Sequence, residues 1–121
     1  MPTRVLIVDD AMFMRAMIKD ILLNAGGFEI VGEAQDGEEA IKMHEQFNPD
    51  LITMDIVMPN VDGIEATRRV IEKDPSVKIV MCSALGQEPL IVESLAAGAK
   101  DFIVKPFSAD KVVKVIQSVL G

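Results

Sequence analysis

The chain has 121 residues, the size of one ordinary globular domain, and half of them are hydrophobic, which is enough to bury a core. Its 12 basic and 19 acidic residues give a formal net charge of -7, so it has no general electrostatic attraction to nucleic acid or to an anionic membrane. Charged residues make up 26% of the chain, which is normal for a globular protein's surface and argues against disorder.

Apolar runs and helical patterns alternate along the chain. Residues 5–8 form an apolar, β-branched run, which is typical of a strand buried on both faces. A helix follows, in which Phe13, Met17 and Ile21 recur at helical spacing. We expect these three residues to form its apolar stripe and the glycine pair 26–27 to end the helix.

Residues 28–34 predict the second strand, and a second helix begins after it. Asp36 and Glu39 have the spacing of a capping box, a pattern that marks the start of a helix. The apolar stripe of this helix consists of Ala40, Met43 and Phe47. We expect His44, which lies beside the stripe, at the surface or at its boundary.

The middle of the chain repeats the same unit. Residues 51–54 predict the third strand, and Asp62 and Glu65 repeat the capping-box spacing at the start of a third helix. The apolar positions of that helix are Ile64, Thr67 and Ile71. Residues 77–82 predict the fourth strand.

The last part predicts a helix around residues 88–97 that ends at Gly98, and a short strand at residues 102–104. Ser108 is the expected cap of the final helix. The apolar residues of this helix are Val112, Ile116, Val119 and Leu120. Five strand–helix units in strict alternation predict an α/β sandwich with a parallel sheet covered on both faces, although the pattern alone does not give the strand order.

Cys82, the single cysteine, lies inside an apolar run, so we expect a buried small side chain in a reducing compartment. The apolar segment near the N-terminus is too short for a signal peptide, and no stretch approaches the length of a transmembrane helix. These features predict a cytoplasmic protein.

Polar residues stand at the ends of four predicted strands. Asp9 and Asp10 follow the first, Asp55 follows the third, Ser83 follows the fourth and Lys105 follows the fifth. The carboxyl ends of parallel strands lie on the same edge of a sheet, so these side chains should converge. One such aspartate would ordinarily be a helix cap, but three carboxylates together repel one another unless a cation or a proton relieves them.

This set of residues suits phosphoryl transfer. Oxygen ligands alone favour a hard cation such as Mg²⁺. An aspartate such as Asp55 can attack phosphorus and carry the group as an acyl phosphate, while Lys105 supplies positive charge and Ser83 a hydrogen-bond donor. We expect no histidine or cysteine near this edge, so histidine-based nucleophilic catalysis has no support.

The motifs resemble bacterial response-regulator receivers along the whole chain, in order and at the family's spacing. The matching segments are residues 5–10, residues 54–59 with the pair Asp62-Gly63, residues 82–84 and residues 105–107. Residues 13–15 and 99–107 resemble the chemotaxis branch of the family more than its transcriptional regulators. The resemblance implies a flavodoxin-like (βα)5 sandwich, with a five-stranded parallel sheet in the order 2-1-3-4-5 flanked by five helices. It also implies one receiver domain over residues 1–121 with no output domain.

The resemblance also assigns roles around the acidic residues. Asp55 corresponds to the phosphoacceptor. Asp10, Asp55 and the backbone carbonyl of Val57 would ligate Mg²⁺, with Asp9 acting mostly through water. The implied protein is a signalling switch rather than an enzyme, capable only of its own phosphoryl transfer and of slow self-dephosphorylation.

Further roles concern the switch. Lys105 would contact the acyl phosphate, and its bond to Pro106 is cis in this family. Ser83 matches the hydroxyl that follows the phosphoryl group inward, and Phe102 falls at the aromatic switch position, where many relatives have tyrosine.

The implied partners are a histidine kinase, which would donate the phosphoryl group from a phosphohistidine, and the flagellar motor switch protein. Val57 and Leu85 flank the route of the hydrolytic water in this family, and both are apolar here. We therefore expect slow self-dephosphorylation and dependence on a separate phosphatase. We expect a monomer that has neither nucleic acid nor membrane as a partner.

Three alternatives stay open from the residues. A flavodoxin-like FMN carrier could share the sheet, but the acidic residues after its first strand oppose a phosphate in the absence of metal. A small-molecule aspartyl phosphatase would place a second aspartate at position 57, where this chain has Val57. The third is a receiver that serves a relay or another pathway outside chemotaxis.

Overall fold

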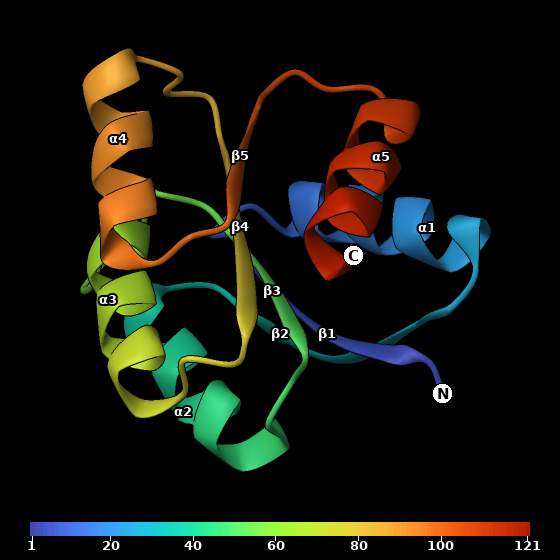
Figure 1. Ribbon diagram of the computed structural model, residues 1–121, viewed down its shortest axis with the longest axis horizontal. Helices are drawn as coiled ribbons and strands as arrows, with labels where there is room; N and C mark the ends of the chain where they lie inside the picture. The colour runs from blue at the N-terminus through green and yellow to red at the C-terminus, as the bar shows by residue number, and fades with distance from the viewer.

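The computed structural model describes residues 1–121 as five strands that alternate with five helices (Figure 1). The strands are β1 Thr3–Val8, β2 Phe28–Ala34, β3 Leu51–Met54, β4 Lys78–Ser83 and β5 Asp101–Val104. The helices are α1 Met12–Ala25, α2 Gly37–Phe47, α3 Gly63–Lys73, α4 Glu88–Ala97 and α5 Ala109–Leu120. All strand pairs are parallel, and the sheet order β2-β1-β3-β4-β5 confirms the flavodoxin-like topology. None of the helices has the length and apolar character needed to cross a membrane.

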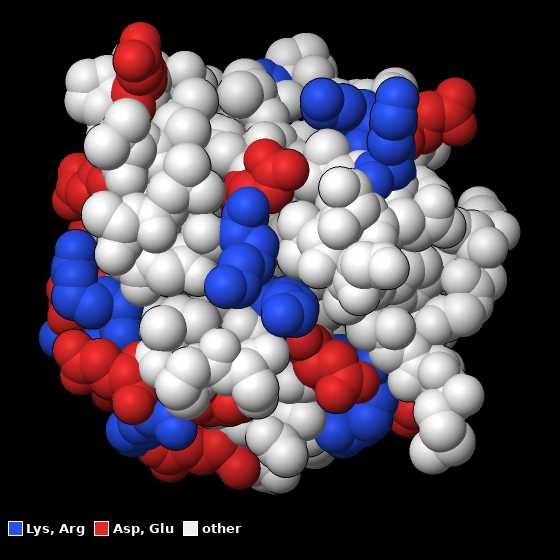
Figure 2. Space-filling view, in the orientation of Figure 1, with Lys and Arg blue, Asp and Glu red and all other residues white.

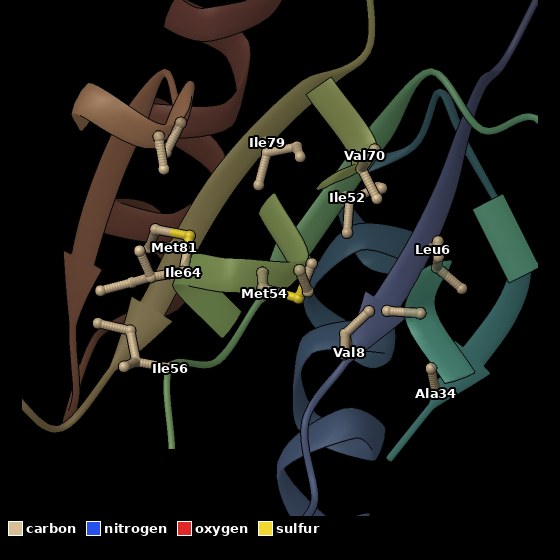
Figure 3. Packing of buried hydrophobic residues seen from close by; sticks show 14 of the residues in the cluster. Leu6, Val8, Ala34, Ile52, Met54, Ile56, Ile64, Val70, Ile79 and Met81 are labelled. Atoms are coloured by element: carbon tan, nitrogen blue, oxygen red, sulfur yellow. The ribbon is translucent and has the colours of Figure 1, made fainter. Parts of the chain in front are cut away.

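The helices cover the sheet from both sides. Helices α2, α3 and α4 lie on one face and α1 and α5 on the other (Figure 1). Because side chains of a strand alternate between faces, each strand contributes to both layers of the core. Figure 3 shows the layer under α2, α3 and α4, where alternate residues of the central strands meet side chains of α3 such as Ile64 and Val70. The other layer joins the remaining strand residues to Ile18 and Leu22 of α1 and Ile116 of α5.

Three helices begin with the predicted caps. The side chains of Asp36, Asp62 and Ser108 each accept a hydrogen bond from the amide three residues later, at 2.8, 2.9 and 3.1 Å. At the other end of α4, Gly98 adopts a φ of 118°, a conformation that glycine reaches without strain. Helix α1 differs, because it begins after Ala11 with no side-chain cap.

The predicted apolar stripe of α1 is wrong. Phe13 is 69% exposed and Met17 is also exposed, whereas Ile18 and Leu22 are buried against the sheet. Of the predicted stripe, only Ile21 packs against the core. Apolar residues occupy more than one face of this helix, so helical spacing selects two stripes and cannot decide which of them faces the sheet.

His44 is a second correction, because the structure buries it. Its Nε2 lies 3.0 Å from Oδ2 of Asp74, which comes from the turn that follows α3. Hydrogen bonds from Ser76 and His44 hold the pKa of Asp74 below its usual range. The buried ring thus has a polar partner 30 residues away, which local sequence pattern does not reveal.

Candidate functional site

Three aspartates converge at the carboxyl edge of the sheet, as predicted. Strands β1 and β3 are neighbours, and Val8 pairs with Met54, so the residues that follow the two strands come side by side. One carboxylate oxygen from each of Asp9, Asp10 and Asp55 lies within 4.8 Å of the other two. Asp9 is 1% exposed and Asp55 is buried, whereas Asp10 faces solvent. The cluster is therefore open on one side only.

Lys105 reaches this cluster from the end of β5. Its Nζ donates a hydrogen bond to Oδ2 of Asp9 at 2.7 Å and lies 3.6 Å from Oδ2 of Asp55. Burial opposes the charge of Lys105, but the hydrogen bond to Asp9 and the attraction of Asp55 outweigh it and raise the pKa of the ammonium above its usual value. A fixed positive charge thus stands between two carboxylates.

The surroundings of Asp55 disfavour the ionised form of its carboxyl group. Burial raises the pKa of its carboxyl above the usual value, Lys105 offsets part of that shift, and the charges of Asp9 and Asp10 add to it. Its Oδ1 accepts a hydrogen bond from the amide of Ile56 at 2.8 Å. An added cation would favour the ionised form, and a set of oxygen donors with one solvent-facing carboxylate fits Mg²⁺, which keeps several of its waters.

The raised pKa of Asp55 predicts a pH-dependent gain in stability for Asp55→Asn. A carboxyl whose pKa is raised by folding destabilises the folded state when it is ionised, so the cost is full above the folded pKa and absent below the unfolded pKa. We expect the metal-free variant to melt a few degrees higher than the wild type at neutral pH, and the difference to vanish as the pH falls below the usual range of aspartate. Circular dichroism melts in EDTA across this pH range measure it. A variant that is less stable at neutral pH would contradict the expectation.

The predicted switch residues lie on the side of the sheet that α4 covers. Ser83 ends β4 on the same side as Met81, and its buried hydroxyl accepts a hydrogen bond from the amide of Leu85 at 3.2 Å. Phe102 of β5 is half-buried and packs against the core layer under α2, α3 and α4. The peptide bond between Lys105 and Pro106 is cis, as the resemblance implied.

Cys82 corrects the expectation that no cysteine lies near this edge. It precedes Ser83 on β4, and the charges of Lys105, Asp9 and Asp55 all act on it. Burial is the main cause that raises the pKa of its thiol to about 12, so it remains protonated at neutral pH and is a poor nucleophile. It is buried, as predicted.

The loop between β3 and α3, which carries Asp55 and Val57, is fastened to two neighbouring helices. The amide of Gly63 donates to the carbonyl of Ile56 at 2.8 Å. The amide of Gly37, at the start of α2, donates to the carbonyl of Val61 at 3.0 Å. These bonds fix the path of the loop and thereby the backbone around the carbonyl of Val57.

One contact to the site involves a residue outside the predicted set. Arg15 of α1 donates from Nη1 to the backbone carbonyl of Asp9 at 2.7 Å. The only sequence signal for it is a basic residue just over one helical turn after Asp10.

Comparison with known proteins gives a consistent answer. The family model of the response regulator receiver domain matches residues 5–117. The chain is 52% identical to the chemotaxis protein CheY of Bacillus subtilis (strain 168) over 121 residues, covering all of both chains. It is 49% identical to the protein CcdB of the same organism over 119 residues, which cover 98% of each chain. Among solved structures, it matches a chain of the CheX–CheY–BeF3–Mg²⁺ complex from Borrelia burgdorferi with a TM-score of 0.96 and 41% identity, covering 100% of this chain and 91% of that one.

Proposed function

Since this chain belongs to the response regulator receiver family, we propose that it is a phosphorylation switch in which Asp55 accepts a phosphoryl group from a histidine kinase. The observation that carries the proposal is the buried Asp55 carboxylate, which lies 3.6 Å from the ammonium of Lys105 beside two further aspartates. The chain is a signalling component of two-component systems rather than a classical enzyme.

In the proposed transfer, a carboxylate oxygen of Asp55 attacks the phosphorus of a phosphohistidine. A bond forms between that oxygen and phosphorus, the phosphorus–nitrogen bond breaks, and the imidazole leaves with the electron pair. Mg²⁺, held by Asp10, Asp55 and the carbonyl of Val57, would supply charge that neutralises the phosphoryl oxygens. Lys105 binds one of those oxygens. Both carboxylate oxygens of Asp9 already accept hydrogen bonds, which supports an indirect role through water.

The proposed response runs from Ser83 to Phe102. The hydroxyl of Ser83, which accepts a hydrogen bond from the amide of Leu85, moves inward and donates to a phosphoryl oxygen, and Phe102 turns into the space that Ser83 leaves. Phe102 then changes the shape of the face formed by α4, β5 and α5, so that the affinity for a partner changes.

We propose the flagellar motor switch protein as that partner and chemotaxis as the pathway. Exposed apolar side chains on this face are Val92, Leu95 and Val104. Figure 2 shows few charged side chains over α4 and many more over α2 and α3. The apolar surface over α4 suits a protein partner better than nucleic acid. Similarity to proteins named CheY supports the pathway. A receiver outside chemotaxis is the second candidate, favoured by similar identity to a relative with another name.

We also propose that residues 1–121 form one receiver domain and that it acts in the cytoplasm as a monomer. The five strand–helix units share one sheet, which supports a single domain. The buried, unpaired Cys82 suits a reducing compartment.

Intact-mass analysis of the purified chain tests the proposal. After incubation with acetyl phosphate and MgCl2, the wild type should gain one phosphoryl group, and excess EDTA should prevent the gain. A chain that gains nothing from acetyl phosphate or from a purified histidine kinase would refute the proposed function.

Two substitutions should shorten the lifetime of the phosphoryl group. Val57 is 59% exposed beside the acceptor, and Leu85 is partly buried. Neither side chain can form a hydrogen bond to an attacking water. We expect Val57→Asn and Leu85→Glu to shorten the phosphoryl half-life severalfold, because each supplies a polar group that can orient that water. Loss of the mass increment with time after removal of acetyl phosphate measures the half-life. An unchanged or longer half-life in both variants would contradict this prediction.

A further inference from the structure

Arg15 joins three elements at the edge of the acidic cluster. It lies on α1, its Nη1 donates to the carbonyl of Asp9 at the end of β1, and its Nε donates to Oε1 of Glu33 on β2 at 3.1 Å. The side chain is only 12% exposed. Glu33 therefore helps to hold the guanidinium in the orientation in which Nη1 reaches the carbonyl of Asp9.

Other bonds in this turn hold Asp9 itself: its amide donates to the carbonyl of Ala34 at 3.0 Å, and Lys105 donates to its Oδ2 at 2.7 Å. Helix α1 has no side-chain cap, and within the turn the amide of Ala11 donates to Oδ1 of Asp9 at 2.9 Å. Asp10 is exposed, so the backbone on either side of it sets the direction of its carboxylate. The bond from Arg15 to the carbonyl of Asp9 fixes the peptide that links these two aspartates.

We propose that Arg15, oriented by Glu33, is a positioning residue for the cation site, since it holds the peptide between Asp9 and Asp10 in the conformation that presents both carboxylates. This inference rests on the proposed function, because it assumes that Mg²⁺ binds among Asp9, Asp10 and Asp55.

The charge of Arg15 and its positioning contact have opposite effects on magnesium affinity, so the direction of the change on substitution tests the inference. A guanidinium near the cluster repels a divalent cation, so loss of its charge alone should strengthen magnesium binding. Loss of the positioning contact should weaken binding instead, and removal of a residue that orients ligands typically lowers metal affinity about 10–100-fold. The two effects oppose each other, and the direction of the change shows which is larger.

The experiment is a titration of the metal-free chain with MgCl2, followed by the ¹H–¹⁵N NMR shifts of the amides of Ala11 and Ile56. The chain has no tryptophan or tyrosine, so NMR replaces fluorescence here. We expect Arg15→Gln to bind magnesium about tenfold more weakly than the wild type. Arg15→Lys keeps the charge but cannot donate to Asp9 and Glu33 with the same fork, so its affinity should be intermediate.

Lys19→Gln is the matched control. Lys19 is the other cation beside Glu33, with Nζ 3.9 Å from Oε2, and it is more exposed than Arg15. This variant loses the same charge without loss of a bond to Asp9, so its affinity should equal or slightly exceed that of the wild type. Circular dichroism melts without metal report the stability of each variant, and Arg15→Lys serves if Arg15→Gln does not fold.

Equal or tighter magnesium binding in folded Arg15→Gln would overturn the inference and leave the proposed function intact, even if that variant melts at a lower temperature. The same holds for equal or tighter binding in Arg15→Lys, should it be the only variant that folds. A wild type whose amide shifts do not respond to MgCl2 would overturn the proposed magnesium site and this inference with it.

Discussion

Asp55→Asn is expected to abolish phosphoryl uptake, so that the intact mass of the variant does not change in acetyl phosphate and MgCl2. The carboxamide has the size of the carboxylate but no anionic oxygen to attack phosphorus, and it also removes one proposed ligand of Mg²⁺. The other two aspartates do not compensate. Both carboxylate oxygens of Asp9 accept hydrogen bonds from the chain, and Asp10 faces solvent while Lys105 pairs with Asp9 and Asp55.

The matched control for this prediction is Asp20→Asn, the same change at an exposed position of α1. It should accept one phosphoryl group as the wild type does. A mass gain that survives in Asp55→Asn would show that another residue is the acceptor, and peptide mapping of the modified chain would locate it.

Gly63→Ala should be the most destabilising single-methyl change in the chain. A Cβ at this position would lie 1.8 Å from the carbonyl oxygen of Asp55, and that oxygen belongs to a backbone that cannot swing away as a side chain could. Alanine would favour the first turn of α3 by about 0.5–1 kcal/mol through helix propensity. The clash outweighs that gain, and we expect a net loss of roughly 3 kcal/mol or more in the free energy of unfolding. Urea denaturation followed by circular dichroism measures it.

Gly32→Ala provides the comparison. A Cβ at Gly32 on β2 would meet Leu6 and Met43 side-chain atoms at 3.4 Å, a distance that a small shift can relieve. We expect its free energy of unfolding to change by less than about 1 kcal/mol. If the two variants prove equally stable, the loop between β3 and α3 is more pliable than its contacts with α2 and α3 indicate. The folded fraction of Gly63→Ala should also accept a phosphoryl group more slowly than the wild type, because the clash would displace Asp55.

Much of the fold follows from local signals. Apolar runs located all five strands to within one or two residues at each end, and the caps at Asp36, Asp62 and Ser108 have short-range physical causes that one sequence displays. Strand order depends on packing between segments far apart, and here it came from the family resemblance. The same resemblance, together with the family match, decides for a receiver over the FMN carrier and the phosphatase.

The candidate site divides in the same way. Asp9, Asp10, Asp55 and Lys105 could be predicted to converge, because parallel strands bring their carboxyl ends together whatever their order. The buried face of α1 could not be predicted from the sequence, since the helix carries apolar residues on more than one side. The partners of His44 and Arg15 could not be predicted either, because each depends on the angle at which a helix packs on the sheet.

The ion pair between Lys105 and Asp9 spans 96 residues of the chain. During synthesis Asp9, Asp10 and Asp55 emerge long before Lys105, and β5, which positions the lysine, is the last strand of the chain and lies at the edge of the sheet. A nascent chain that stops short of β5 thus holds its acidic cluster without the ammonium that offsets it. Under the proposed function, an incomplete translation product would carry the phosphoacceptor Asp55 without the lysine that pairs with it.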